Sequence, residues 1–201
     1  MFALVESGSI TKMLNGNRGI TIDGIQHPRA IYTLWTEAER NAIGIYTVEI
    51  DNSKKKNEEW YINTNITYAF SGGKVTGSYG DATAKAHADT LYTAQDETDG
   101  LGTEGDVKVE GLKTKLIRNV KAQAEGELNR TDWYVIRKSE EDTAIPSAIT
   151  THRKAVRSKQ AAMETSITNA SDTPALETLY TYTKQEDGSV TRPLGEIPIL
   201  E

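Results

Sequence analysis

The sequence predicts an α+β protein, with a small antiparallel β-domain first and an α-helical hairpin with an extended tail after it. Three observations lead to this prediction. Short β-branched and aromatic runs alternate with Gly-containing turns at the start, an acidic Gly-rich stretch follows, and apolar residues then recur at helical spacing. We therefore expect a β-rich domain (1–80), a linker (81–111), a helical hairpin domain (112–170), and a short turn with an extended tail (171–201).

The first strands are expected to form a hairpin. Residues 2–6 and 9–14 are short runs on either side of Ser7-Gly8, a typical turn pair. Residues 19–23 alternate in polarity and predict a third strand, which Asp23-Gly24 closes.

A short helix is expected over residues 37–43. Thr36 is a good N-cap, Glu39 stands at the position of a capping box, and Gly44 suits a left-handed C-terminal residue. A strand over residues 45–50 should follow.

Two further strands complete the predicted β-domain. The polar stretch 51–59 is expected to be an exposed loop. Residues 60–70 are aromatic and β-branched and predict a strand, the turn 71–74 reverses the chain, and 75–79 is the return strand. Residues 81–99 are interpreted as extended or partly helical, and 100–111 as a linker.

The second half is predicted to be helical. Leu112, Leu116, Val120, Ala124 and Leu128 recur every four residues, which indicates one apolar helix face. Thr131-Asp132 is a cap for a short second helix over 133–138, and 139–143 reads as a polar turn.

A longer helix of about twenty residues should start near Pro146, because proline suits a first helical turn. Ile149, Val156, Met163 and Ile167 form its apolar repeat. A short turn is expected over 175–180, and the final RPLGEIPILE should be extended.

Composition narrows the function classes. The 201 residues carry a net charge of −6 and no cysteine, which removes disulfides, thiol nucleophiles and thiolate metal sites. No apolar stretch reaches membrane-spanning length, and the first residues do not resemble a signal peptide, so we expect no membrane insertion.

The charge is unevenly distributed. Residues 96–110 hold six acids and one lysine, whereas 113–159 are richer in Lys and Arg. Solvated helix faces beside an acidic linker explain this pattern. The alternative is that the basic face meets an acidic partner, or the chain's own acidic stretch. The basic residues lack interleaved aromatics, so nucleic acid is not an expected partner.

No catalytic, cofactor or metal site is predicted. His27, His87 and His152 are scattered without zinc-ligand spacing, and no nucleophile-elbow pattern occurs. The glycines of SGGKVTGSYG fit a hairpin turn better than a phosphate loop. We therefore expect a protein that is not an enzyme.

Trp133 is the residue expected to matter most, as a buried aromatic that locks the first long helix against the third. Val156 should belong to the same core. Arg153 and Arg157 lie one helical turn apart and are expected to pair with acids of a neighbouring element. The structural and interaction candidates are Thr131, Asp132, Trp133, Pro146, Arg153, Val156 and Arg157.

These residues carry a family resemblance. Thr131-Asp132-Trp133 after Leu128, Ile145-Pro146, and the helix bearing Arg153, Val156 and Arg157 resemble the C-terminal part of tail proteins of tailed bacteriophages, in the tail-fibre-assembly-like group of marine phages. His152 stands where that group usually has an aromatic residue. MFALVESGSITKM is similar to the group's opening pattern M-x-A-L-V-x-x-G-x-I, and WTEAERNAIGIYTVE to the segment that follows it.

The resemblance implies a non-enzymatic structural protein of the virion tail: a fibre, baseplate or adaptor component. It would be present in the host cytoplasm during assembly. The alternative is a tail-fibre assembly chaperone that is absent from the mature particle. Implied partners are other phage tail or fibre proteins and a receptor on the host surface. We expect a homo-oligomer, with a trimer favoured, whose strands add to a partner's sheet edge or whose tail straps onto a neighbouring subunit.

Overall fold

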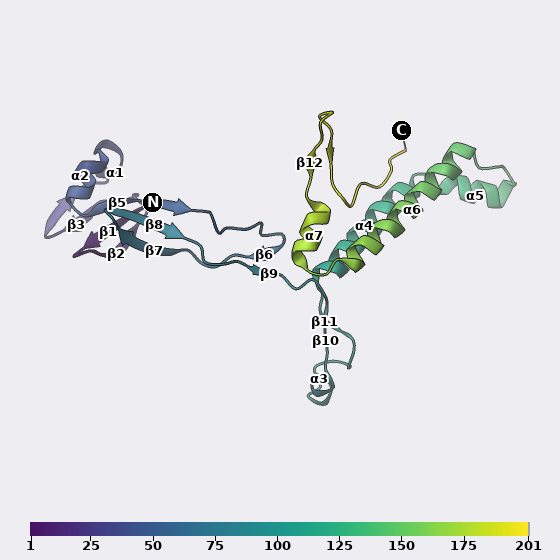
Figure 1. The fold of residues 1–201 in the computed structure, drawn as a ribbon, viewed down its shortest axis with the longest axis horizontal. Coiled ribbons are helices and arrows are strands. Elements are labelled where there is room, and N and C mark those ends of the chain that lie inside the picture. The colour runs from purple at the N-terminus through teal and green to yellow at the C-terminus, as the bar shows by residue number, and fades with distance from the viewer. Residues whose placement is uncertain (201) are drawn as a thin grey trace. The chain divides into compact units, whose positions relative to one another are not determined.

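The computed structural model describes residues 1–200, which divide into two compact units, Met1–Thr83 and the chain from Ala84 onward (Figure 1). The first unit is built mainly on a β-sheet, and the second contains the long helices. The predicted α+β class is confirmed.

A five-stranded sheet forms the centre of the first unit, in the order β2-β1-β5-β8-β7. Three of its neighbouring pairs are antiparallel, as expected for the β-domain, whereas β5 and β8 run parallel, which was not predicted. The chain leaves β5 by a long connection and re-enters through the β7–β8 hairpin, which places β8 beside β5 in the same direction. The strands are β1 (Phe2–Glu6), β2 (Ser9–Leu14), β5 (Ile45–Asp51), β7 (Thr67–Ser71) and β8 (Lys74–Ser78).

Both faces of this sheet contribute buried side chains, since successive side chains of a strand point to opposite faces. On one face Ala3, Val5, Val48 and Val75 are buried together. Side chains from both edge strands pack against this cluster, and β2 contacts β7, so the sheet curls around it.

The other face is covered by the chain between β2 and β5. Leu4 and Ile45 of the sheet pack there against Ile31 and Tyr32. The covering elements are β3 (Ile20–Ile22), β4 (Ile25–His27), α1 (Ile31–Leu34) and α2 (Glu37–Ala42).

The predicted α2 helix forms as its capping residues dictate. The Thr36 hydroxyl accepts from the Glu39 amide, and the Glu39 carboxylate accepts from the Thr36 amide at 2.7 Å. Gly44 has a φ of +79° and ends the helix with a left-handed residue. By contrast, β4 and α1 were not predicted.

The prediction of one continuous strand over residues 60–70 was wrong, because residues 63–66 separate two shorter strands. The chain forms β6 (Tyr61–Ile62) and then β7, with Trp60 and Tyr61 buried. The last strand of this region, β9, is short (Thr83–Ala84).

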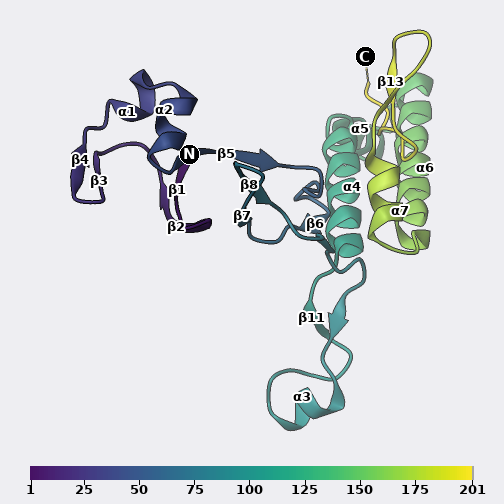
Figure 2. The same ribbon diagram turned by 60° about the vertical axis from the view of Figure 1, so that its left-hand side comes forward.

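The second unit begins with a protruding ribbon, which we call the arm (residues 89–110). It contains β10 (Thr90–Leu91), α3 (Ala94–Thr98) and β11 (Val107–Val109), with the two strands paired antiparallel. Figures 1 and 2 both show the arm extending away from the first turn of α4. No residue of the arm is buried.

Four helices follow the arm. They are α4 (Leu112–Asn129), α5 (Asp132–Glu141), α6 (Ser147–Asn169) and α7 (Thr173–Tyr180). The α4–α6 core contains most of the residues that the apolar repeat predicts: Leu116, Val120, Ala124, Ile149, Val156, Met163 and Ile167. Leu112 and Leu128, at the two ends of the α4 repeat, are half-buried.

The chain ends in a small hairpin and a tail. The hairpin pairs β12 (Thr183–Lys184) with β13 (Val190–Thr191), and its residues are exposed. Residues 192–200 form the tail, which returns along the helices without regular secondary structure.

Candidate functional site

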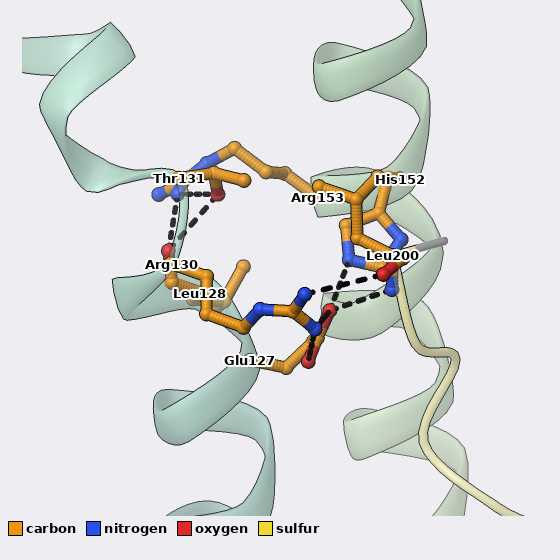
Figure 3. Close-up of polar contacts among 7 residues, drawn as sticks. All are labelled: Glu127, Leu128, Arg130, Thr131, His152, Arg153 and Leu200. Atoms are coloured by element: carbon orange, nitrogen blue, oxygen red, sulfur yellow. Dashed lines mark hydrogen bonds and ion pairs between the residues drawn. The ribbon is translucent and has the colours of Figure 1, made fainter.

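A buried polar cluster lies where α4 ends and α5 begins, facing α6 (Figure 3). Arg153 of α6 is 8% exposed and donates to the Leu128 carbonyl at 2.8 Å and to Thr131 Oγ1 at 2.6 Å. Its Nη2 also lies 2.8 Å from Asp132 Oδ1. The Thr131 hydroxyl donates to the same Leu128 carbonyl at 3.0 Å. Three of the predicted candidates therefore meet in one place.

This cluster fixes the bend between two helices. The last carbonyls of a helix lack intrahelical donors and attract positive charge. Arg153 supplies both the donor and the charge to α4, and it then holds the first residue of α5 through Asp132. Thr131 is the N-cap residue of α5, but its side chain makes no capping bond there, because it is used inside the cluster.

A second polar cluster, centred on Glu127, adjoins the first (Figure 3). Glu127 Oε1 accepts from the Leu200 amide at 2.7 Å and contacts His152 Nε2 at 3.0 Å. Arg130 Nη1 lies 2.9 Å from the other carboxylate oxygen, and Arg130 Nη2 donates to the Leu200 carbonyl at 3.3 Å. The Leu200 amide, followed by the Arg130 guanidinium, holds the pKa of Glu127 below its ordinary value.

The tail is held at a second point. The Lys159 ammonium donates to the Leu194 carbonyl at 2.7 Å, and the Leu194 amide donates to the Leu179 carbonyl at 3.0 Å. The Leu194 side chain is buried. The extended tail that the sequence suggested as a strap for a neighbouring subunit thus lies on the helices of its own chain.

The expectation that Trp133 is buried was wrong. Its side chain is 50% exposed and stacks on Tyr134, with ring centroids 3.9 Å apart, and the Arg137 guanidinium lies 4.8 Å from the Trp133 ring. Thr131 and Arg153 occupy the helix junction instead, so Trp133 does not lock α4 against α6.

The other residues of α5 are exposed or half-buried. The helix contains no buried residue, and Val135 and Ile136 are exposed together with Trp133. Large apolar side chains on one short helix that buries none of them indicate a surface suited to another protein.

The remaining candidates divide between core and surface. Val156 is fully buried, as predicted. Pro146 is the N-cap residue of α6, directly before the expected first turn. Arg157 is exposed, and of the two arginines only Arg153 has a described ion pair with an acid of a neighbouring element.

A shallow groove, which we call the helix-pair groove, runs between α4 and α6 and continues onto the surface of α4 at Ile117 and Arg118. Apolar groups and cations line it together with three carboxylates, Glu125, Asp132 and Glu164. Lys121 lies 3.7 Å from Glu164, a weak exposed pair. The residues used below are Ile117, Arg118, Lys121, Leu128, Arg157 and Ala161.

The histidines lie in separate surroundings. His27 packs edge-on against Trp35, the His87 backbone carbonyl accepts from the Lys113 amide, and His152 joins the Glu127 cluster. Within residues 1–200 no group of three potential ligands is placed to hold a metal ion. No helix in that range combines the length and apolar character of a membrane span.

The Glu127 cluster was not predicted. Glu127 and Arg130 are three residues apart on a helix, which is a recognisable pair, but their partners His152 and Leu200 are 25 and 73 residues from Glu127. The spacing of residues along a single helix cannot predict contacts between such distant parts of the sequence.

Comparison with known proteins identified no relative. No protein family matches the chain, no curated protein matches it, and no solved structure matches it.

Proposed function

We propose that this protein is a non-enzymatic structural component of a bacteriophage virion tail that acts through protein–protein contacts. The phage assignment rests on the resemblance carried by Thr131-Asp132-Trp133 and the arginine-bearing helix that follows. The proposed partners are other tail or fibre proteins, with homo-oligomers, trimers in particular, as the assembled form.

The observation that carries the protein-contact function is the exposed face of α5. Isolated helices of about ten residues are marginal in water and are usually stabilised by packing of an apolar face. In α5 that face, with Trp133, Val135 and Ile136, packs on no core of the described chain. Tryptophan, tyrosine and arginine are also the residue types enriched at binding hot spots, and α5 presents Trp133, Tyr134 and Arg137 as one stack.

Each predicted segment is assigned a separate role in the proposed assembly. We propose that the β-rich domain (1–80) and the helical hairpin domain (112–170) contact different neighbours in the tail. In this arrangement the segment between them (81–111) supplies the arm, and the C-terminal segment (171–201) stabilises the hairpin.

The test is mass spectrometry of purified infectious particles, with this protein quantified against the major capsid protein. A fixed copy number in the particle is the expected result. Abundance in infected cells together with absence from particles would refute the virion assignment and favour the assembly-chaperone alternative.

A variant in the same experiment tests whether α5 is needed for incorporation into the particle. Trp133→Ala should lower the copy number in particles, because it removes the largest exposed apolar side chain of the proposed contact. Glu186→Lys, on the exposed β12–β13 hairpin, is the matched control and should leave the copy number unchanged. Equal incorporation of both variants would show that α5 is not the contact surface.

A further inference from the structure

The arm leaves its large apolar side chains exposed to solvent. A lone two-stranded ribbon is marginally stable in water. The arm nevertheless exposes Leu91, Leu101, Val107 and Val109, each between 47% and 59%. Four large apolar side chains on one unburied ribbon indicate that something covers it.

The charge of the arm limits what that partner is. Residues 89–110 contain seven acidic residues and one lysine. Lys108 already pairs with Asp96 at 2.6 Å, and that contact, with the capping bonds from Thr93, lowers the pKa of Asp96 to about 2. With seven acids against this one paired lysine, the arm requires a basic, partly apolar partner surface.

Such a surface is present on the same chain. Helices α4 and α6 together carry eight Lys and Arg residues against three Glu. The helix-pair groove combines cations at Arg118, Lys121 and Arg157 with apolar groups at Ile117, Leu128 and Ala161. Arg118 and Lys121 already pair with Glu110 and Glu164, so Arg157 is the cation that the arm of another copy would meet first. All of its lining residues come from α4, α6 and the first residue of α5, so neither α7 nor the tail fills it.

Within residues 1–200 of one copy, only the two end residues of the arm are hydrogen-bonded to this groove, Asp89 at Thr114 and Glu110 at Arg118. The root of the arm is fixed beside the first turn of α4, where Asp89 accepts from the Gly111 amide at 2.7 Å and from the Thr114 hydroxyl at 2.7 Å. Glu110 forms a two-bond contact with Arg118 there. From this root the arm extends away from the helices in both views (Figures 1 and 2).

We propose that the arm of one copy docks in the helix-pair groove of a second copy. The contact joins two different surfaces, so it is heterologous, and repetition of it either closes a ring or continues as an open chain. This inference deepens the proposed function, on which it rests for its biological setting, by naming a self-contact. Its test uses purified protein alone.

The experiment is sedimentation of the full-length chain across a concentration series at low and high salt. The contact pairs opposite charges, so self-association is expected to weaken about tenfold or more as ionic strength rises from about 0.1 M to about 1 M. A monomer at every concentration, or association that salt does not weaken, would overturn the proposal.

Two charge reversals identify the surfaces. Glu104→Lys changes an exposed acid of the arm, and Arg157→Glu changes an exposed cation of the groove. Each variant alone should raise the dissociation constant about tenfold. Glu186→Lys is the control for net charge and should not change it, and circular dichroism should show the same helix content in all three variants.

Mixing the two variants is the decisive step. In an equimolar mixture, the reversed arm of the Glu104→Lys variant meets the reversed groove of the Arg157→Glu variant. The unchanged arm of the second variant likewise meets the unchanged groove of the first, so both contacts again pair opposite charges. The mixture should therefore associate more tightly than either variant alone.

Failure of this rescue, or association abolished by Trp133→Ala instead, would overturn the arm-to-groove contact. Neither outcome bears on the copy number of the unmodified protein in particles, so the two proposals fail separately.

Discussion

Replacing Arg153 with alanine is the most direct test of how the helical unit is held together. The substitution removes three contacts of one nearly buried guanidinium, to the Leu128 carbonyl, Thr131 Oγ1 and Asp132 Oδ1. Truncation of a buried hydrogen-bonded charge commonly costs about 3–5 kcal/mol.

Two features of the structure lower the loss of stability expected for Arg153→Ala. The Leu128 carbonyl keeps two other donors, the amide and the hydroxyl of Thr131, each at 3.0 Å. The Asp132 side chain is 46% exposed, so water can solvate its carboxylate once the arginine is gone. We therefore expect a loss of about 2–3 kcal/mol in the free energy of unfolding, mainly from the lost hydrogen bonds and the lost packing of the arginine stem.

The assay is urea unfolding followed by the helical circular dichroism signal, which the helix-rich second unit dominates. With a slope of about 1–3 kcal/mol per molar urea, the midpoint should fall by about 0.7–3 M. Arg157→Ala is the matched control, one turn further along α6 and exposed, and should change stability by less than about 0.5 kcal/mol. If the two variants have equal midpoints, the junction does not depend on the Arg153 contacts.

Three further predictions test the core, the exposed helix and the tail. Met163→Ala should lower the free energy of unfolding by about 2–5 kcal/mol in the same assay, because Met163 is 1% exposed; a change below about 1 kcal/mol would contradict its place in the core. Trp133→Ala should destabilise the isolated protein only slightly in thermal unfolding, by less than about 1 kcal/mol, and a loss of about 3 kcal/mol or more would show that it is buried after all. The lowered pKa of Glu127 means that its contacts stabilise the folded tail above the ordinary carboxylate pKa of about 4.3, and that this stability is lost as pH falls through the lower folded value. Protection of the Leu200 amide from hydrogen exchange should therefore decrease in acid, and Glu127→Gln should remove this pH dependence; protection that is equal at all pH values would contradict the contact.

The sequence predicts the long helices well because their information is local. The four-residue repeat of α4 and the seven-residue repeat of α6 each place apolar groups on one face, and these residues are buried except at Leu112 and Leu128, which are half-buried. The capping pair Thr36 and Glu39 predicts α2 for the same reason.

The misses concern elements whose positions depend on distant parts of the chain. A continuous aromatic and β-branched run over 60–70 favours one strand, yet Trp60 and Tyr61 are buried and the pairing interrupts the run after β6. The parallel neighbours β5 and β8 are likewise chosen by the sheet as a whole.

Trp133 shows the same limit at the candidate site. A tryptophan near a helix start is usually buried. Here Arg153 and Thr131 fill the junction instead, and Arg153 donates a hydrogen bond to the Leu128 carbonyl near the end of α4. Helical spacing placed Arg153 on the correct face of α6, whereas its partners 22 and 25 residues earlier could be found only from the folded chain.

The geometry at the root of the arm determines where the chain can gain or lose residues. The two ends of the arm lie together, because the Leu112 amide donates to the Ala86 carbonyl and the Lys113 amide to the His87 carbonyl, both at 3.0 Å. A segment whose ends already meet can be shortened, lengthened or replaced without moving the helix that follows it. The arm is thus the place where insertions and deletions are expected to accumulate during divergence, while the helical hairpin keeps its length.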